Sequence, residues 1–561
     1  MKNVYGGGLG DASTEALVYG NVAVNLNQGV AAISKGAVVT DHLFGCNNIN
    51  GSPKGTVTVQ VYATQNSSTS SILIKDQNSN SYDMKGVYGG GNMAAYKPYT
   101  AATATNVIIE GCGLTSIEYV YGGGNAAPVP ATIVNIYGSY KLGDVFGGGN
   151  GKDQIRINGV LTDNPGADVG IYKVDAATWT AAAAEGLQYT DESPNHDKGN
   201  DKYIYYGSIA DPSIIGTTRV TLYGGNINNL FGGSNTKGDI VKESKVILGD
   251  QDLKTCEFDV DDVYGGSNEA YMSGTSSINM NCTDGMGEIF GGSRMADVHQ
   301  DVVLTITGGH YRKVFGGNNL SGRIYGSITI NIEQTGCLPI EIDELYGGGN
   351  QAPYSVYGYD GFETGEDGID RPIPRTTAQQ GVTPHHDPVI NIVSCKRIGT
   401  VYGGGYQAKM VGSPTINVNM VKGWTNGHYL GKNDQNGVLD QTDPHYEFVG
   451  EEGKKSFTEI GVIGTIFGGG NEAEVVGDTH VNIGTQSSVT VHNVSKDVYT
   501  KITQNNARPD ITDPGFNAND DDDVTKDLTI QVEGVNITGN VYGGGNNANV
   551  TGKTNVQIGQ E

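Results

Sequence analysis

One glycine-rich hexapeptide recurs along the chain and constrains the fold more than any other feature. The letters VYGGGN begin at Val87, Val120 and Val541, and the shortest full spacing is 25 residues, as from Gly122 to Gly147. Such a period is typical of stacked units that cannot bury their apolar face alone. Near copies begin at Val4, Val145, Leu345, Val401 and Ile466 and shorter relatives at Leu43, Leu222, Leu230, Val263, Ile289 and Val314, which makes 14 copies.

A second pattern, in which polar and apolar residues alternate, lies between the copies. Examples are GKTNVQI at 552–558, GDTHVNI at 477–483 and GTSSINM at 274–280. This alternation predicts strands with one face toward an interior. A short strand before the glycines and an extended link after them complete a unit of three short strands and three turns. We therefore predict an all-β fold, a right-handed parallel β-helix (β-solenoid) with about 25 residues per coil and hydrogen bonds between successive coils.

Two predictions concern the corner that the motif forms. We expect its glycines to permit a tight turn with positive φ. We also expect the asparagine after them, as at Asn125 and Asn546, to tolerate the left-handed region and to bond its side-chain amide to the asparagine of the next coil.

Four long insertions interrupt the period, at approximately 152–218, 351–388, 423–463 and 485–539. Because the repeat continues on both sides of each, we predict a single β-solenoid domain over residues 1–561, with the insertions as ordered loops or small subdomains. The first two follow the glycine-rich corner and the last two follow the first strand of a unit, so they should emerge along restricted sides of the rod. In the first, Asp175 to Gly186 is typical of a short capped helix.

The charge balance bears on partners. The chain has 61 acidic and 35 basic residues and a formal net charge of -26, which disfavours nucleic acid and anionic membrane surfaces. No apolar run is long enough for a membrane helix, so no membrane insertion is expected within this chain. Neither end resembles a capping unit, which predicts end-to-end or side-by-side self-association. We expect the chain to be a piece of a longer exported protein whose targeting signal lies elsewhere.

Five of the six cysteines fall seven to nine residues before a motif aromatic, and so at similar turns of different coils. Small, buried and unreactive side chains are the first interpretation, and disulfides between neighbouring coils are the second. The five are Cys112, Cys256, Cys282, Cys337 and Cys395.

Aromatic residues are the candidate binding groups. Trp179 and Trp424 both lie in insertions. Alternation along the short strand turns the motif aliphatic inward and the aromatic outward, so the rings form either a platform for sugars or partners or a stack that only shields the corner. The motif tyrosines chosen as binding candidates are Tyr88, Tyr121, Tyr346, Tyr402 and Tyr542.

Catalytic and metal signals are weaker. The adjacent His385, His386 and Asp387 are candidate ligands for a transition metal, and Asp520, Asp521, Asp522 and Asp523 for Ca²⁺; solvated loops are the alternative for both. Cleavage of a polysaccharide needs opposed charged groups, and the outward strand positions show no repeated acid pair. An enzyme would therefore draw its acids from the insertions.

The TxVxI strands joined to VYGGGN corners resemble the glycine-rich repeats of large secreted or surface-anchored bacterial proteins of the adhesin type. The resemblance covers nearly the whole chain apart from the insertions, and it implies a right-handed parallel β-helix outside the cell or on its surface. It implies no catalytic positions.

Two functions follow from these observations. The first is a non-enzymatic extracellular adhesin or stalk that displays its insertions to a host or cell-surface glycan or protein. The alternative is a carbohydrate-active enzyme, a polysaccharide lyase or glycoside hydrolase. Whether the chain is an enzyme stays open at this point, and no cofactor other than Ca²⁺ is expected.

Overall fold

The computed structural model contains strands and no helix in the part of the chain that it describes. Those residues are all except 30–35, 65–81, 100–102, 158, 175–188, 191–201, 206–213, 250–257, 282, 284–285, 337, 357–358, 366–367, 375–384, 427, 431–446, 450–454, 458, 496–524 and 561. The helix expected from Asp175 to Gly186 lies outside them. The all-β prediction is confirmed.

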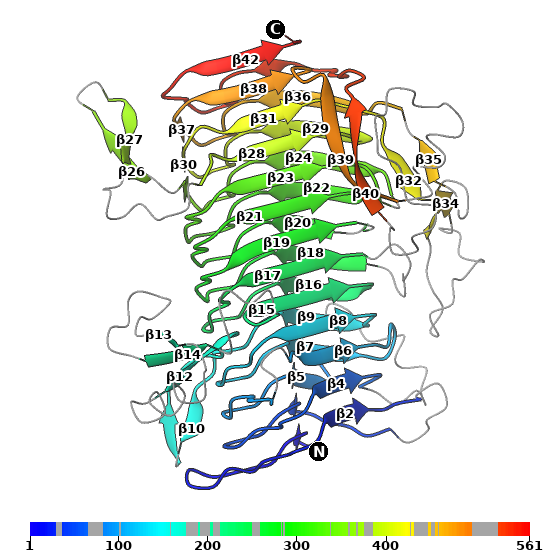
Figure 1. Cartoon of the computed structure of the whole chain (residues 1–561), viewed down its shortest axis with the longest axis vertical. Coiled ribbons are helices and arrows are strands. Elements are labelled where there is room, and N and C mark those ends of the chain that lie inside the picture. The colour runs from blue at the N-terminus through cyan, green and yellow to red at the C-terminus, as the bar shows by residue number, and fades with distance from the viewer. Residues whose placement is uncertain are drawn as a thin grey trace.

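Two parallel sheets of 13 strands each form the body of the molecule (Figure 1). The strands of the first sheet end on the motif aromatic. They are β1 (Asn3–Tyr5), β3 (His42–Phe44), β5 (Met84–Tyr88), β7 (Ser116–Tyr121), β9 (Lys141–Phe146), β16 (Gly225–Phe231), β18 (Phe258–Tyr264), β20 (Met286–Phe290), β22 (Gly309–Phe315), β24 (Ile340–Tyr346), β29 (Arg397–Tyr402), β36 (Val462–Phe467) and β41 (Val541–Tyr542).

The second sheet contains the alternating strands. It is built from β2 (Val22–Leu26), β4 (Val57–Val61), β6 (Thr105–Ile109), β8 (Thr132–Ile136), β15 (Thr217–Leu222), β17 (Glu243–Leu248), β19 (Thr275–Met280), β21 (Val302–Ile306), β23 (Ile328–Ile332), β28 (Val389–Ile392), β31 (Thr415–Val418), β38 (Thr479–Ile483) and β42 (Thr554–Ile558). Strands of the two sheets alternate along the chain, and we call one strand of the first sheet with the next strand of the second a layer.

The third extended segment of each unit is shorter than expected. Within the described residues it forms a parallel sheet only at β25 (Tyr354–Ser355), β30 (Met410–Val411) and β37 (Val475–Val476). Elsewhere it makes single parallel bridges, such as Met272 to Val298 and Val298 to Ile324. The prediction of three strands per unit therefore holds for hydrogen bonding between layers but not for strand length.

Burial follows the alternation. In β8 the side chains of Thr132, Val134 and Ile136 are buried, and those between them are only partly so. Thr132 fits an apolar core because its hydroxyl donates a 2.6 Å hydrogen bond to the carbonyl of Gly147, at the corner of the next layer. A buried carbonyl without a partner would cost about 1–3 kcal/mol. The same bond to the corner glycine of the next layer is made by Thr105, Thr218, Ser276 and Thr479.

The motif glycines have a different purpose from the one predicted. None of the glycines in the full motif copies has a positive φ, so the predicted left-handed corner is wrong. A Cβ on Gly89 would come within 3.0 Å of the carbonyl oxygen of Gly122 in the next layer, and a Cβ on Gly122 would meet Gly147 in the same way. Glycine is required here because the backbones of successive corners almost touch.

The asparagine ladder is confirmed by its hydrogen bonds. Where the layer before also has an asparagine, the side-chain amide donates to its carbonyl oxygen, at 2.8 Å from Asn125 to Asn92 and from Asn150 to Asn125, and at 3.0 Å from Asn235 to Asn150. Asn471 follows a layer with a tyrosine at this position and donates to the hydroxyl of Tyr346 at 3.4 Å. The only non-glycine residue with positive φ in the described chain is Asn27. The asparagines therefore hold the corner by side-chain bonds and not by a left-handed backbone.

One of the 14 motif copies does not form a layer. Leu222 ends β15 in the second sheet, and the ring of Tyr223 stacks on Tyr137 at 4.5 Å, away from the other motif aromatics. Gly225, two residues further, has a φ of 126° and begins β16. Counting every copy of the motif as a layer therefore gives one layer too many, because the copy at Leu222 does not end a strand of the first sheet.

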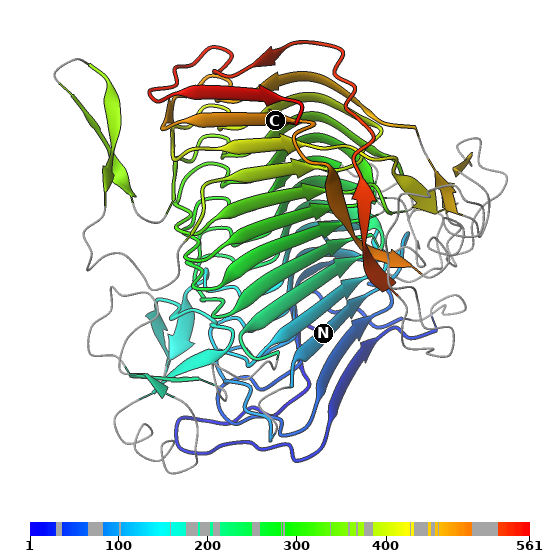
Figure 2. The same cartoon turned by 45° about the horizontal axis from the view of Figure 1, so that its top comes forward.

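The predicted insertions contain the antiparallel strands. Those of the first two insertions lie on one side of the stack and those of the last two on the opposite side (Figures 1 and 2). They are β10 (Ile155–Ile157), β11 (Val160–Thr162), β12 (Ile171–Val174), β13 (Tyr189–Thr190), β14 (Lys202–Tyr205), β26 (Tyr359–Thr364), β27 (Asp370–Pro374), β32 (Trp424–Asn426), β33 (His428–Leu430), β34 (Glu447–Val449), β35 (Lys455–Phe457), β39 (Ser488–Ser495) and β40 (Thr525–Gln531).

The described cysteines differ in state. Cys395 is a free, buried thiol, as is Cys46, and burial raises the pKa of Cys395 to about 12, which makes it unreactive. Cys112 is disulfide-bonded, so the unreactive interpretation is wrong for this residue. Cys256, Cys282 and Cys337 lie outside the described residues.

Candidate functional site

The motif aromatics form one continuous stack. Neighbouring rings lie face to face, with centroids 4.7 Å apart from Tyr88 to Tyr121 and from Tyr346 to Tyr402. These four tyrosines are at most 7% exposed. Both faces of each ring are covered by its neighbours, so an open sugar platform does not exist at these positions and the shielding interpretation describes them. Tyr542, which is 45% exposed, stacks on Phe467 and ends the row.

Only one of the two candidate tryptophans lies among the described residues, and it is buried. Trp424 is 2% exposed and packs in an apolar cluster with Val393, Val489 and Leu528. It therefore fixes an insertion to the stack and presents no face to a ligand. Trp179 lies outside the described residues.

The candidate metal ligands do not converge. Nδ1 of His385 lies 2.9 Å from Oδ1 of Asp301, whereas Nδ1 of His386 lies 2.7 Å from the backbone oxygen of Asp387. Oδ1 of Asp387 accepts the backbone N–H of Ser413 in the next layer. Within the described residues, no group of three or more His, Cys, Asp or Glu side chains is placed to hold a metal ion. Asp520, Asp521, Asp522 and Asp523 lie outside that part of the chain.

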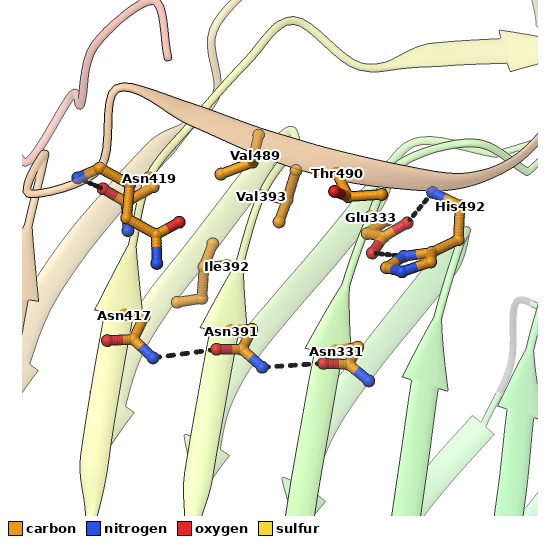
Figure 3. Close-up of a pocket in the computed structure, with 11 residues that line it drawn as sticks. Asn331, Glu333, Asn391, Ile392, Val393, Asn417, Asn419, Val489, Thr490 and His492 are labelled. Carbon is orange, nitrogen blue, oxygen red and sulfur yellow. Dashed lines mark hydrogen bonds and ion pairs between the residues drawn. The ribbon is translucent and has the colours of Figure 1, made fainter. Parts of the chain in front are cut away.

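A polar pocket lies where the β39–β40 hairpin crosses the end of the second sheet (Figure 3). Its volume is about 190 Å³. The hairpin contributes Val489, Thr490 and His492 and the layers β23, β28 and β31 contribute the opposite wall. That wall consists of Asn331, Glu333, Asn391, Ile392, Val393, Asn417 and Asn419, and Gln486 closes one end.

A second asparagine ladder forms the floor of this pocket. The amide of Asn391 donates to Asn331 at 2.9 Å, and that of Asn417 donates to Asn391 at 3.0 Å. The row continues beyond the pocket to Asn482, which donates to Asn417 at 2.9 Å. These residues align because successive strands of the second sheet pair in register.

One carboxylate belongs to the pocket, and it is already engaged. Oε2 of Glu333 accepts the backbone N–H of His492 at 2.9 Å, and Oε1 lies 2.7 Å from Nδ1 of the same histidine. Glu333 follows β23 in the stack, and His492 belongs to the insertion. The pair therefore joins the hairpin to the layers from the polar side, and the cluster around Trp424 joins it from the apolar side.

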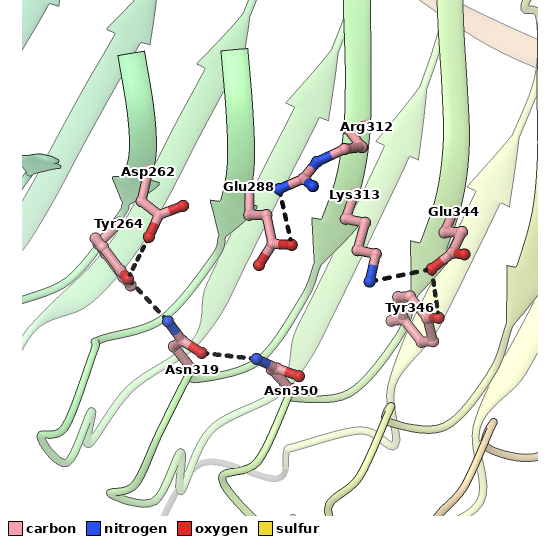
Figure 4. A network of polar contacts seen from close by, with 9 residues as sticks. All are labelled: Asp262, Tyr264, Glu288, Arg312, Lys313, Asn319, Glu344, Tyr346 and Asn350. Carbon is pink, nitrogen blue, oxygen red and sulfur yellow. Dashed lines mark hydrogen bonds and ion pairs between the residues drawn. The ribbon is translucent and has the colours of Figure 1, made fainter. Parts of the chain in front are cut away.

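A charged surface covers the outer face of the first sheet. In β18, β22 and β24 two consecutive residues before the motif aliphatic are at least partly exposed, so strict alternation is interrupted there. The register places Asp262 beside Glu288 and Glu288 beside Lys313 on neighbouring strands. Glu288 pairs with Arg312 at 3.1 Å, and Lys313 lies 3.6 Å from Glu344 (Figure 4).

Asp262 is an acid of this surface whose pKa is shifted by its surroundings. Burial, together with the negative charge of Glu288, raises the pKa of Asp262 above its ordinary value, against a hydrogen bond from the Tyr264 hydroxyl. That hydroxyl also accepts a 2.8 Å hydrogen bond from Asn319. Two neighbouring carboxyls are the chemical minimum for acid–base work on a glycosidic bond.

The sequence contained a signal for this pair. Each acid is the residue directly before the motif aliphatic, Asp262 before Val263 and Glu288 before Ile289, and aligning the copies on the motif puts them in adjacent layers. The absence of an acid pair expected at these positions is therefore wrong. The pocket gave no such signal, because Glu333 and His492 are 159 residues apart.

Comparison of the chain with protein-family models, characterised proteins and solved structures found no match in any of the three. The functional assignment therefore depends on the two sites themselves. No helix in the described part of the chain is long and apolar enough to cross a membrane.

Proposed function

We propose that this chain is a right-handed parallel β-helix that works outside the cell as a non-enzymatic adhesin or stalk module, binding a host or cell-surface glycan or protein through its insertions. The alternation of the two parallel sheets along the chain, with bridges on a third side, supports the β-helix. Handedness rests on the general preference of parallel crossovers. The disulfide at Cys112 supports an oxidising compartment.

The observation that carries the binding function is the pocket under the β39–β40 hairpin. An insertion closes over a row of uncharged amides and fixes itself there by Glu333–His492 and the Trp424 cluster. Concave sites with a few convergent polar groups are where ligands bind. Among the described residues that line the pocket, Glu333 is the single carboxylate, which favours binding over bond cleavage.

The test is a panel of soluble polysaccharides and surface proteins, read both by retention on the immobilised chain and by release of reducing ends. Thr490→Arg places a long cation in the pocket wall. Thr529→Arg is the matched control, because Thr529 pairs with Thr490 across the hairpin but does not line the pocket. We expect retention by the wild type and by Thr529→Arg, loss with Thr490→Arg, and no product. Equal retention by both variants would contradict the binding role of the pocket.

The alternative is a carbohydrate-active enzyme, and Asp262 with Glu288 is the observation that favours it. In that case reducing or unsaturated ends would accumulate with time, and Asp262→Asn would abolish them. Lys245→Gln, on the second sheet, would leave them unchanged and serves as the control. The engagement of Glu288 by Arg312 makes this the second choice.

A further inference from the structure

We propose that the pocket under the β39–β40 hairpin takes one uncharged sugar residue and recognises its hydroxyl groups through the asparagine ladder. The inference deepens the proposed binding function and rests on it, since it names the ligand class of the same site. Its basis is the chemistry of the lining residues: their amide groups, their apolar surface and their charge.

The amides match hydroxyl groups in both directions. A primary amide has two N–H donors and an oxygen with two lone pairs. In the ladder Asn391 uses one donor toward Asn331 and one lone pair for Asn417, which leaves one donor and one lone pair. A sugar hydroxyl both donates and accepts, so neighbouring hydroxyls on one ring can be bonded by successive rungs. The rungs follow the spacing of strands in a sheet, about 4.8 Å.

Asn419 adds a fixed group at one end of the pocket. Its side chain is 3% exposed, and its Oδ1 accepts the backbone N–H of Gln486 at 3.0 Å. Its Nδ2 has no acceptor among the described residues, although the side chain lines the pocket. A ligand oxygen at this point can accept a hydrogen bond from that amide.

Two valines offer an apolar surface, one on the hairpin and one on the layers. Val393 and Val489 line the pocket while packing in the cluster that contains Trp424. A pyranose ring has an apolar C–H face as well as its hydroxyl rim, and a site that combines branched aliphatic side chains with amides fits both. A volume of about 190 Å³ is below the range of roughly 300–1,000 Å³ for drug-sized ligands, which favours a single ring at the end of a chain.

Charge excludes acidic sugars. No lysine or arginine is among the described residues that line the pocket, and the carboxylate of Glu333 is held by His492. A uronate, sulfate or phosphate group would enter without a cation, against a chain of formal charge -26. The pocket therefore favours a neutral ring.

The experiment measures binding of methyl glycosides of glucose, galactose, mannose and N-acetylglucosamine by ligand-observed NMR and calorimetry, with methyl glucuronide as the charged comparison. The variants are Asn391→Ala and Asn417→Ala. Asn482→Ala is the control, because Asn482 belongs to the same ladder but does not line the pocket. The thermal midpoint of each variant shows that it folds. We expect one neutral glycoside to bind at least about tenfold more weakly to both test variants, the equivalent of one lost hydrogen bond, and unchanged binding to Asn482→Ala.

Equal affinity of Asn391→Ala, Asn417→Ala and Asn482→Ala for that glycoside would overturn the site, and stronger binding of the glucuronide would overturn the ligand class. If no glycoside binds while a surface protein is retained by the wild type and lost with Thr490→Arg, the sugar inference fails and the proposed binding function stands. If neither glycans nor proteins are retained, both fail.

Discussion

Replacement of Gly404 by alanine tests whether the motif glycines are required by contact between layers. A Cβ on Gly404 would lie 2.8 Å from the backbone nitrogen and 2.9 Å from the Cα of Gly470 in the next layer. Ordinary contact begins near 3.4 Å, so the layers must separate by about 0.6 Å. The 3.1 Å hydrogen bond from Gly404 N to Gly469 O would then lengthen beyond a useful distance.

The expected cost combines two effects and is reduced by a third. Overpacking a tight contact costs about 1–3 kcal/mol and the weakened hydrogen bond about 1 kcal/mol. Alanine recovers about 0.4–1 kcal/mol by restricting the unfolded chain. We expect Gly404→Ala to lower the free energy of unfolding by about 1–3 kcal/mol, measured by denaturant titration, and to speed hydrogen exchange at the amide of residue 404, which donates to Gly469 O.

Gly544 provides the matched control, because it occupies the same motif position and a Cβ there would meet nothing within 4 Å. Gly544→Ala should leave stability unchanged or raise it by up to about 1 kcal/mol. If Gly404→Ala and Gly544→Ala had the same effect, layer contact would not be the reason for the glycine.

Three further predictions concern the core. Burial raises the pKa of Asp239 to about 7 from 3.8, so its contribution to stability is complete below pH 3.8 and is lost as the pH rises through 7; thermal scans of Asp239→Asn should lose this pH dependence, and an unchanged profile would refute it. Thr132→Val removes the bond to Gly147 and should cost about 1–3 kcal/mol in denaturant unfolding, with Thr58→Val, partly exposed on β4, as a neutral control. Phe290→Ala should cost about 3–5 kcal/mol, and a value below 1 kcal/mol would mean that the ring stack adds little.

The sequence predicted those parts of the fold that follow from repetition. Alternation located the buried positions of β19 and β38, because each residue of a strand between solvent and core faces either one or the other. The motif asparagines were correctly joined into a ladder, because equivalent positions in register must meet. The glycines were assigned correctly as necessary but for the wrong reason, since a list of residues does not reveal how closely two backbones approach.

The candidate site could be predicted only in part. The proximity of Asp262 and Glu288 could have been predicted, because both lie at the same distance from the motif in neighbouring layers. The pocket was not, because it forms where an insertion folds back on the stack and brings His492 to Glu333. The net charge of -26 predicts that the chain does not bind nucleic acid or anionic membrane surfaces, and this stays a prediction.

A stack of equivalent layers has a difficulty with specific recognition. Each outward row presents similar groups at a constant interval, so a ligand that fits one rung of a ladder fits the next nearly as well and has no single register. Asn391 and Asn482 illustrate this, because they make the same amide bond although one lies in the pocket and the other outside it. The hairpin removes the equivalence by covering some rungs and adding Thr490 and His492. Recognition at one position therefore requires an interruption of the repeat, and substitutions in the insertion should change ligand choice where substitutions in the motif change only stability.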